Sequence, residues 1–408
     1  MKEEKITITN AQELRQEKCN VPTLRFPNYS SEWQVSPMGK VCTFRKGYGI
    51  SKENLSSDGT PCILYGELYT TYKTAIAKNI KSKTSLDPTI LFHSKKNDVI
   101  IPCSGETAED IATSVCIPYD DILLGGDLTV IRSDLDGAFL SNQINSVRKY
   151  DIARIAQGKS IVHLQADELK KISIAYPTID EQQKISGFID KIDERIEVQN
   201  KIISKYETLI KGISCDYFSK QPNHIAKLKD LIIKGKAGGT PSSAVAEYYN
   251  GDIPFLSISD MTKQGKYVEF TEKHISENGL GNSSAWIVPP NSLILSMYAS
   301  VGLVCINKVP LATSQAMFSM VLKDSNMLDY IYYYLNFFRE TQIHRLLETG
   351  TQSNINADTV RDIEIPFYSN ILVFVKTLQA IENRLNNEKD MLSRLMDLKT
   401  YLLSSLFI

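Results

Sequence analysis

The chain has 408 residues, of which 42% are hydrophobic and 23% are charged, and its formal net charge at pH 7 is −1. This length accommodates two or three domains, each with its own hydrophobic core. The near-neutral charge excludes a protein that attracts nucleic acid through its overall charge, but it allows a local basic patch. No apolar run reaches the ~18 residues of a membrane helix, and the polar N-terminus does not resemble a signal peptide. Seven scattered cysteines without a C-x-x-C pair suit a reducing compartment, so we expect a cytoplasmic protein without a membrane partner.

After a flexible tail at residues 1–20, a first globular domain is predicted at 21–176. Short apolar runs such as "DVIIPC" (98–103) and "DILLGGDLTVI" (121–131), bounded by turn-forming residues, predict short β-strands. From Lys40 to Lys83, eight Lys and Arg residues stand against three acidic residues, a local excess of five positive charges. This excess fits a surface that faces phosphate groups and, equally well, a solvated lysine-rich surface.

Residues 177–218 are predicted to form one long helix. Thr178 and Glu181 have the T-x-x-E spacing of a capping box, in which each side chain bonds a backbone N–H of the first turn. Apolar residues then recur at alternating spacings of four and three, which is the pattern of a coiled-coil seam. The seam residues are Ile185, Ile189, Ile192, Ile196, Ile203, Tyr206, Ile210 and Ile213, with Gln199 in the remaining position.

A second globular domain is predicted at 219–370, with strands such as "GDIPFLSIS" (251–259), and a second long helix at 371–408. The seam of this helix consists of Phe374, Leu378, Ile381, Leu385, Leu392, Leu395 and Leu402. Glu388 takes the place of Gln199 in the seam, where the two residues either form a polar layer that fixes the register or face solvent. Two such seams predict an antiparallel helix pair, and each helix of ~37 residues would be ~55 Å long and act as a ruler.

The two halves of the chain are repeats of one another. The matched segments are "MGKVCTFRKGYG" (38–49) with "LKDLIIKGKAGG" (228–239), "DGTPCILYGEL" (58–68) with "NGDIPFLSISD" (250–260), "IPYDDILL" (117–124) with "VPPNSLIL" (288–295), and "SNQINSV" (141–147) with "TSQAMFSM" (313–320). The offset is about 190 residues at the ends of each half and about 171 in the middle. We therefore expect an insertion near 75–115 and, near 326–346, an aromatic helix without a counterpart. The predicted fold class is α+β, with two pseudo-symmetric domains separated by two long antiparallel coiled-coil helices.

No pattern of a catalytic or metal site is present. "GKS" (158–160) lacks the first glycine of a P-loop, because position 153 is Ala, so this loop cannot wrap a phosphate group. "VPPN" (288–291) lacks both the polar first residue and the terminal aromatic residue of the amino-methyltransferase motif. We therefore predict no catalytic residue, no metal ligand and no cofactor in this chain, and we expect that it is not an enzyme.

Several segments carry a resemblance to a known family. They are the lead-in "LRFPNYSSEWQVSPMGKV" (24–41), the domain openings "KGYGISKENLSSDGTPCILYGELYT" (46–70) and "KAGGTPSSAVAEYYNGDIPFLSISDM" (236–261), and the helix start "PTIDEQQKISGFIDKID" (177–193). Together they resemble the specificity subunit of type I restriction-modification enzymes, over nearly the whole chain after about residue 20. The second helix start, "PFYSNILVF" (366–374), departs from this pattern because it lacks the Glu-Gln pair.

The resemblance implies that the two globules are target-recognition domains, each of which reads one half of a split, asymmetric site in double-stranded DNA. It implies that the helices set the gap between the halves and dock two modification subunits, which methylate adenine with S-adenosylmethionine. Restriction/translocase subunits, which use ATP and Mg, would complete the endonuclease. A duplicated reader also favours half-sites about one helical turn, ~34 Å, apart.

Hydrogen-bond donors and acceptors on loops read base edges. Lysines, and backbone N–H groups at glycine turns, contact phosphates. The candidate DNA contacts are Lys46, Tyr48, Lys52, Tyr69, Tyr72, Lys73, Lys159 and Ser160 in the first domain, and Thr240, Ser242, Ser243, Lys263, Lys266, Ser353 and Asn354 in the second. The alternative for the tyrosines is a half-buried place in the core, and for Thr240 a role in shaping a turn.

Two other classes of function stay open at this point. One is a free-standing methyltransferase or nuclease with degenerate motifs, although no glycine-rich cofactor loop is present. The other is an interaction scaffold that is built on the coiled coil and has no role at DNA.

Overall fold

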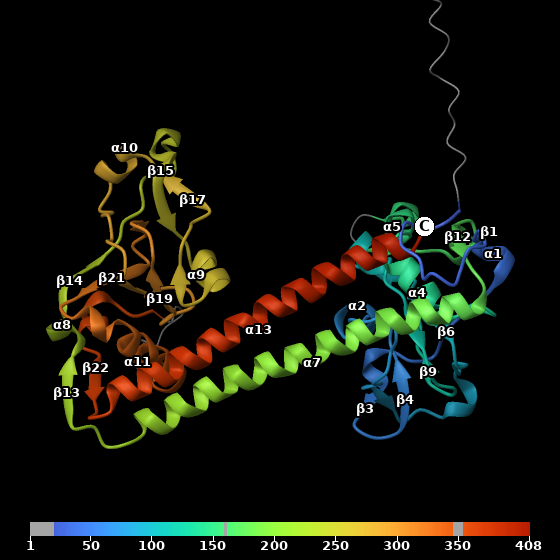
Figure 1. Cartoon of the computed structure of the whole chain (residues 1–408), viewed down its shortest axis with the longest axis horizontal. Coiled ribbons are helices and arrows are strands. Elements are labelled where there is room, and N and C mark those ends of the chain that lie inside the picture. The colour runs from blue at the N-terminus through green and yellow to red at the C-terminus, as the bar shows by residue number, and fades with distance from the viewer. Residues whose placement is uncertain (1–19, 159–160, 346–353) are drawn as a thin grey trace, which may run out of the picture. The chain divides into compact units, whose positions relative to one another are not determined.

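The computed structural model describes residues 20–158, 161–345 and 354–408 (Figure 1). The chain divides into two compact units, each described by itself below. The first unit is Met1–Lys201 with Asp390–Ile408, and the second unit is Ile202–Lys389. The division falls inside both long helices, α7 (Ile179–Phe218) and α13 (Ile371–Leu406), each of which is a single uninterrupted helix (Figure 1). Each unit therefore combines one globule with a stretch of both helices.

The globule of the first unit contains two four-stranded sheets of short strands and two two-stranded sheets. Its helices are α1 (Met38–Val41), η1 (Lys52–Asn54), α2 (Glu67–Thr70), η2 (Pro88–Ile90), α3 (Ala108–Ile111), α4 (Gly137–Asn145), α5 (Lys149–Ile155) and α6 (Ala166–Leu169). Its strands are β1 (Gln34–Pro37), β2 (Cys42–Lys46), β3 (Leu55–Ser56), β4 (Thr60–Ile63), β5 (Lys83–Thr84), β6 (Asp98–Pro102), β7 (Ser104–Gly105), β8 (Val115–Ile117), β9 (Leu123–Leu124), β10 (Leu128–Ser133), β11 (Val162–His163) and β12 (Ser173–Tyr176). The central sheet has the order β2-β10-β6-β8 and is antiparallel, while β4 and β9 pair in parallel in the other four-stranded sheet.

The globule of the second unit follows the same plan. Its helices are α8 (Leu228–Leu231), η3 (Ala246–Tyr248), α9 (Ile258–Gln264), α10 (Glu277–Gly281), η4 (Ser325–Met327), α11 (Leu328–Thr341), η5 (Ile343–Arg345) and α12 (Ala357–Arg361). Its strands are β13 (His224–Lys227), β14 (Ile232–Ala237), β15 (Tyr249–Leu256), β16 (Tyr267–Val268), β17 (Lys273–Ile275), β18 (Leu293–Ser296), β19 (Val304–Asn307), β20 (Ala312–Thr313), β21 (Met317–Leu322) and β22 (Glu364–Phe367). Here β14-β21-β18-β19-β16 is the central sheet, and β15 and β20 form the parallel pair.

The matching strand orders confirm the predicted duplication and the α+β fold class, and they also correct the alignment in the middle of each half. The counterpart of β18 is β6. In the second unit β18 lies between β21 and β19, and in the first unit β6 lies between the corresponding strands β10 and β8. The segments 117–124 and 288–295 are therefore not equivalent. Residues 141–147 belong to α4 and the residues after it, whereas 313–320 run from the end of β20 through a loop into β21. Short apolar runs look alike in sequence, and only their pairing partners distinguish them.

Corresponding strands give a nearly constant offset, so the predicted insertion near 75–115 is wrong. In the parallel pairs, Leu123 of the first unit corresponds to Ala312 of the second, which lies 189 residues later in the chain. The strands β10 and β21 begin at Leu128 and Met317, which are also 189 residues apart. The aromatic helix α11 has a counterpart as well. It lies between β21 and α12, where the first unit has α4 between β10 and α6.

The two long helices pair antiparallel within each unit, as predicted from the seams. In the first unit, Ile185 and Ile189 of α7 belong to one buried cluster with Leu402 and Leu406 near the end of α13. In the second unit, Tyr217 near the end of α7 stacks on Phe374 near the start of α13, with ring centroids 3.8 Å apart. Burial of such side chains stabilises the pairing by about 1.5–3 kcal/mol each.

The lead-in segment of the first unit holds the start of α7, and it does so through Glu181, the residue predicted to take part in a capping box. The carboxylate of Glu181, which is fully buried, accepts two hydrogen bonds of 2.8 Å from the Arg25 guanidinium. The Leu24 N–H donates to the Ser405 carbonyl at 2.9 Å, which ties the same segment to the end of α13. Of the helices in the described ranges, none is long and apolar enough to cross a bilayer.

Candidate nucleic-acid interface

Four loops of the second unit meet at one end of its central sheet. The loop after β14 begins at Gly238 and Gly239, whose N–H groups donate to the carbonyls of Met317 (3.1 Å) and Thr313 (2.9 Å). A Cβ atom on Gly238 would lie 2.0 Å from the Thr313 carbonyl oxygen. Only glycine therefore allows this loop to approach the β20–β21 loop so closely.

The loop between β18 and β19 lies at the same end and has unusual backbone geometry. The Met297 N–H donates to the Ala316 carbonyl at 2.8 Å, and the Met297 carbonyl accepts from the Ile355 N–H at 3.1 Å. Ala299 and Ser300 have φ values of 40° and 53°, a left-handed conformation that non-glycine residues rarely adopt. Such strain persists where the surrounding structure enforces it, which is common at binding sites.

The exposed side chains at this end are small and polar, with one aromatic ring. The Thr240 hydroxyl donates to the side-chain carbonyl of Gln315, and both side chains are exposed. Ser242 and Ser243 are exposed on the same loop as Thr240, and Tyr298 is 40% exposed. The structure thus brings together three of the predicted contacts.

Two further residues, Gln315 and Asn354, lie at this end of the sheet; the sequence predicted a DNA contact for Asn354 but not for Gln315. Gln315 was missed, although its position in a polar "TSQ" segment between two strands is a usable signal, and glutamine can bond adenine through two atoms. Asn354 is half-buried and directly precedes Ile355, whose N–H bonds Met297, so it lies beside the β18–β19 loop.

In the first unit, equivalent backbone hydrogen bonds hold the loops at the corresponding end of the central sheet. The N–H groups of Gly47 and Tyr48 donate to the carbonyls of Leu128 (2.9 Å) and Leu124 (3.2 Å). The Cys103 N–H donates to the Asp127 carbonyl at 2.7 Å, and the Cys103 carbonyl accepts from the Leu164 N–H at 2.9 Å. These four bonds correspond one by one to the four bonds of Gly238, Gly239, Met297 and Ile355. The two globules therefore present equivalent loops at equivalent places.

The side chains at this end differ completely between the two units. In the first unit, Lys46 is exposed at the end of β2, and Tyr48 is 52% exposed with its ring edge-on to Phe92 at 6.3 Å. The exposed imidazole of His163 bonds the Ser104 hydroxyl at 3.1 Å. His163 and Ser104 were missed because each lies alone in the sequence. This end combines a cation, an aromatic ring and hydrogen-bonding groups, which suits phosphate and base contact.

Most of the basic side chains between Lys40 and Lys83 are exposed on the first globule. Of the eight Lys and Arg residues between Lys40 and Lys83, seven are exposed, and Lys52 and Lys73 are among them. The eighth, Lys78, is directed to the long helix α7, where it pairs with Asp190 and Glu194. Tyr69 is half-buried in α2, and burial raises the pKa of its hydroxyl, with Tyr65, Glu106 and Asp110 adding to the effect.

Tyr72 and Lys266 lie in the interior, and their burial argues against DNA contact. Tyr72 is 8% exposed and packs in a cluster with Ile63 and Leu68, so its ring belongs to the core, and burial raises the pKa of its hydroxyl. The Lys266 side chain is 10% exposed and pairs with two carboxylates. It also precedes β16, which pairs with the end of β19 that is farther from the β18–β19 loop.

The structure does not place the remaining predicted contacts at the loop ends. Lys263 is exposed but forms an ion pair with Glu272 of the same globule. Lys159, Ser160 and Ser353 lie outside the described residues. Within the described ranges, no group of three His, Cys, Asp or Glu side chains could hold a metal ion.

The family model for the type I restriction modification DNA specificity domain matches residues 30–208 and 222–389. The chain belongs to this family. The two matched regions coincide with the two repeats seen in the strand order.

Known specificity subunits are similar to part of the chain. The type I restriction enzyme MjaIX specificity subunit of Methanocaldococcus jannaschii is 30% identical over 147 residues, which cover 36% of this chain and 34% of that protein. The type I restriction enzyme HindI specificity subunit of Haemophilus influenzae is 31% identical over 180 residues, which cover 42% of this chain and 38% of that protein. The matched region thus spans about a third of the length of these curated relatives.

Solved structures share the fold over more than nine-tenths of the chain. The S subunit of a type I restriction-modification system from M. genitalium superimposes with a TM-score of 0.60 at 16% identity, covering 95% of this chain and 99% of that chain. A second solved chain, from work on complex assembly and conformational transition of the type I R-M system, gives a TM-score of 0.58 at 16% identity, covering 92% and 97%. At this identity the similarity establishes the arrangement of elements that specificity domains share.

Proposed function

We propose that this chain is the DNA-specificity subunit of a type I restriction-modification complex. In this proposal, the loop end of each globule reads one half of a bipartite DNA site. One observation carries the proposal: two loop ends are built by the same four backbone hydrogen bonds but present different side chains. A shared frame with different side chains suits a target whose halves are read in the same way but differ in sequence.

The long helices fit the role of a spacer between the two readers. They are continuous over 40 and 36 residues, which corresponds to about 60 and 54 Å at 1.5 Å per residue. We propose that they set the gap between the half-sites and dock two modification subunits. Those subunits would supply S-adenosylmethionine-dependent methylation of adenine, and restriction/translocase subunits would supply ATP- and Mg-dependent cleavage. The complex would act on double-stranded DNA in the cytoplasm.

The decisive experiment maps methylated adenines in the genome of cells that produce the modification subunit with and without this chain. The expected result is a two-part, asymmetric motif that appears only when the chain is present. A methylation pattern that does not depend on the chain would refute the proposal. Methyl transfer or cleavage by the purified chain alone would instead support a free-standing enzyme.

The scaffold alternative is tested in the same assay. A triple substitution of the exposed residues Lys46, Lys52 and Lys73 by Glu reverses three charges on the first globule. The specificity-subunit proposal expects loss of site-specific methylation, whereas a scaffold without contact to DNA would retain it.

A further inference from the structure

Lys266 is the centre of a polar network at the end of the sheet that lies away from the candidate interface. Its ammonium group is 2.7 Å from the Asp329 carboxylate and 2.7 Å from the Glu382 carboxylate, and it donates to the Tyr333 hydroxyl at 2.8 Å. The side chains of Lys266, Asp329 and Glu382 are 10%, 20% and 19% exposed. A lysine that was predicted to contact phosphate thus faces inward and is fully engaged.

This network joins three elements of the second unit. Lys266 lies between α9 and β16, Asp329 lies in the first turn of α11, and Glu382 lies on the long helix α13. Gln379 of α13 donates to Asp329 at 2.7 Å, and the Tyr333 hydroxyl donates to Glu382 at 2.5 Å. The globule is therefore fastened to α13 by directional bonds in addition to apolar packing.

The network holds the pKa of Lys266 above and that of Asp329 below their ordinary values, so both groups are charged near neutral pH. Burial alone would lower the pKa of the Lys266 ammonium, but Glu382 and Asp329 outweigh it and raise the pKa. Burial of the Asp329 carboxyl is likewise outweighed by its bonds to Lys266 and Gln379, which lower its pKa. Removal of Lys266 would leave two partly buried carboxylates, Asp329 and Glu382, without their common counter-ion, which strongly destabilises the local geometry.

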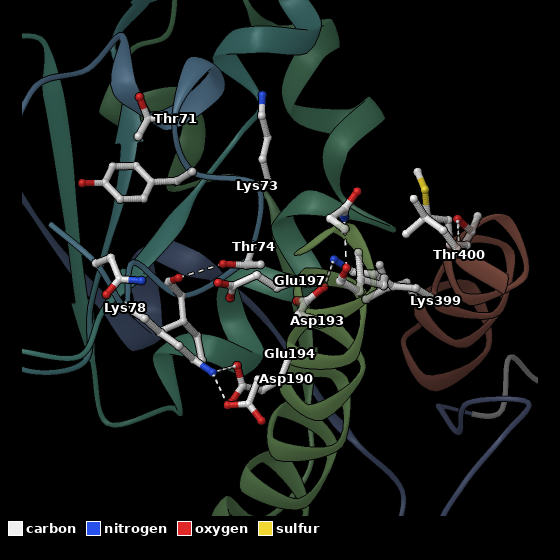
Figure 2. Close-up of a pocket in the computed structure, with 18 of the residues that line it drawn as sticks. Thr71, Lys73, Thr74, Lys78, Asp190, Asp193, Glu194, Glu197, Lys399 and Thr400 are labelled. Atoms are coloured by element: carbon white, nitrogen blue, oxygen red, sulfur yellow. Dashed lines mark hydrogen bonds and ion pairs between the residues drawn. The ribbon is translucent and has the colours of Figure 1, made fainter. Parts of the chain in front are cut away.

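The first unit contains a related connection at the same place in the fold. Ile76 forms a parallel bridge with Cys116, which corresponds to the pairing of β16 with β19 in the second unit. Two residues later, the ammonium of Lys78 is 2.6 Å from Asp190 and 2.8 Å from Glu194 of α7, as Figure 2 shows. In both units, a lysine beside an edge of the central sheet thus pairs with a carboxylate on a long helix: Lys78 with Asp190 and Glu194 of α7, and Lys266 with Glu382 of α13.

Lys78 and Lys266 are not equivalent positions in the repeat. By the strand pairing, Lys266 corresponds to Ala75. The Ala75 carbonyl accepts a hydrogen bond from the Cys116 N–H, as the Lys266 carbonyl does from the Ile306 N–H. The two units therefore make the same type of connection with different residues.

We propose that Lys266 is a positioning residue that fixes the angle of the second globule on its stretch of the helix pair, and that this angle sets the gap length the subunit accepts. The inference rests on the proposed function. One additional base pair in the gap shifts a half-site by about 3.4 Å and rotates it by about 34°. Only a globule held at a fixed angle can reject such a shift, so loss of the network relaxes the selection of gap length and leaves base reading unchanged.

The test uses the full chain assembled with its modification subunits and DNA duplexes that carry the mapped half-sites. The gap is the native length or one base pair longer. The variants are Lys266→Met and Glu382→Gln, the second of which keeps the size and an acceptor oxygen of the side chain. Because misplacement by 1 Å can change rates on the order of 100-fold, we expect the preference for the native gap to fall by at least about tenfold in both variants.

A matched control is available in the same unit. Lys229 forms a surface ion pair with Asp362 at 2.9 Å, and neither residue touches a long helix in the described contacts. Lys229→Met is expected to keep the wild-type preference for gap length. Circular dichroism and thermal unfolding of each assembled variant report whether the fold is retained.

The outcomes separate this inference from the proposed function. A folded Glu382→Gln variant with the wild-type gap preference would overturn the inference, and so would a change in the half-site sequence itself. If Lys266→Met does not fold, Glu382→Gln and the more exposed Lys78→Met of the first unit decide the question. A wild-type complex without any site-specific methylation would instead refute the proposed function.

Discussion

Arg25 offers a quantitative test of how the lead-in segment secures the start of the first long helix. Its guanidinium donates two hydrogen bonds of 2.8 Å to Glu181, whose side chain is fully buried, while the Arg25 side chain is 10% exposed. The bond to Glu181 also raises the pKa of Arg25. In the variant Arg25→Met the Glu181 carboxylate remains buried without a counter-ion.

The expected magnitude follows from this burial. Breaking a buried pair by removal of one partner costs about 3–5 kcal/mol. Because the Arg25 side chain is 10% exposed, we expect a loss at the lower end of this range, about 3 kcal/mol in the free energy of unfolding. Replacement of both partners by apolar residues, Arg25→Met with Glu181→Leu, should recover most of that loss, because no unpaired charge is then left in the interior.

Urea unfolding of the purified chain measures these differences in the free energy of unfolding. The control is Lys171→Met, which removes an exposed pair with Glu168 and should cost less than about 1 kcal/mol. If Arg25→Met loses no more than this control, or if the double variant is no more stable than Arg25→Met, the buried pair does not hold the helix start as argued.

Three further predictions concern the interface and the polar network. Gln315→Ala should weaken discrimination at one base pair of one half-site by about 1–3 kcal/mol and leave the other half-site unchanged, as measured by methylation of duplexes with single substitutions. Lys46→Met should weaken DNA binding to a similar extent for all sequences and reduce the slope of log affinity against log salt by about 1; a sequence-dependent effect would show a base contact instead. For Asp329, whose pKa is lowered in the folded chain, the stabilisation is present above the ordinary pKa of 3.8 and is lost as the pH falls through the folded pKa. The stability difference between wild type and Asp329→Asn should therefore shrink below about pH 3.8, and a difference that is constant with pH would contradict the assignment.

The duplication and the long helices could be predicted from sequence because their signals are periodic and extend over many residues. A seam of eight apolar positions remains visible even when Gln199 interrupts it. The middle of each globule could not be aligned, because strands of two to six residues carry too little pattern to distinguish β9 from β6 as the counterpart of β18. Hydrogen-bonding partners resolve the ambiguity, and these become visible only in the folded chain.

The residues of the candidate site could be predicted only where the signal is local in the sequence. Residues next to strand ends, such as Lys46, Tyr48 and Thr240, could be found from turn signals, and the structure places them at the loop ends of their sheets. Lys266 could not be distinguished from a surface lysine, because its partners Asp329 and Glu382 are 63 and 116 residues away in sequence. The chemistry of a lysine is the same in both settings, and only tertiary packing decides which anion it meets.

The repeated backbone bonds explain how the two loop ends can diverge in their side chains while they keep the same geometry. A bond from one N–H to one carbonyl does not depend on the side chain of either residue, so it holds a loop in place while its side chains change. At corresponding positions, the first unit has Ser104, Gly126 and His163 where the second has Tyr298, Gln315 and Asn354. Each substitution changes the donors and acceptors offered to a base edge but leaves the four bonds of the frame intact. Under the proposed function, an asymmetric target is the expected consequence of a duplicated protein built in this way, because each loop end can change separately.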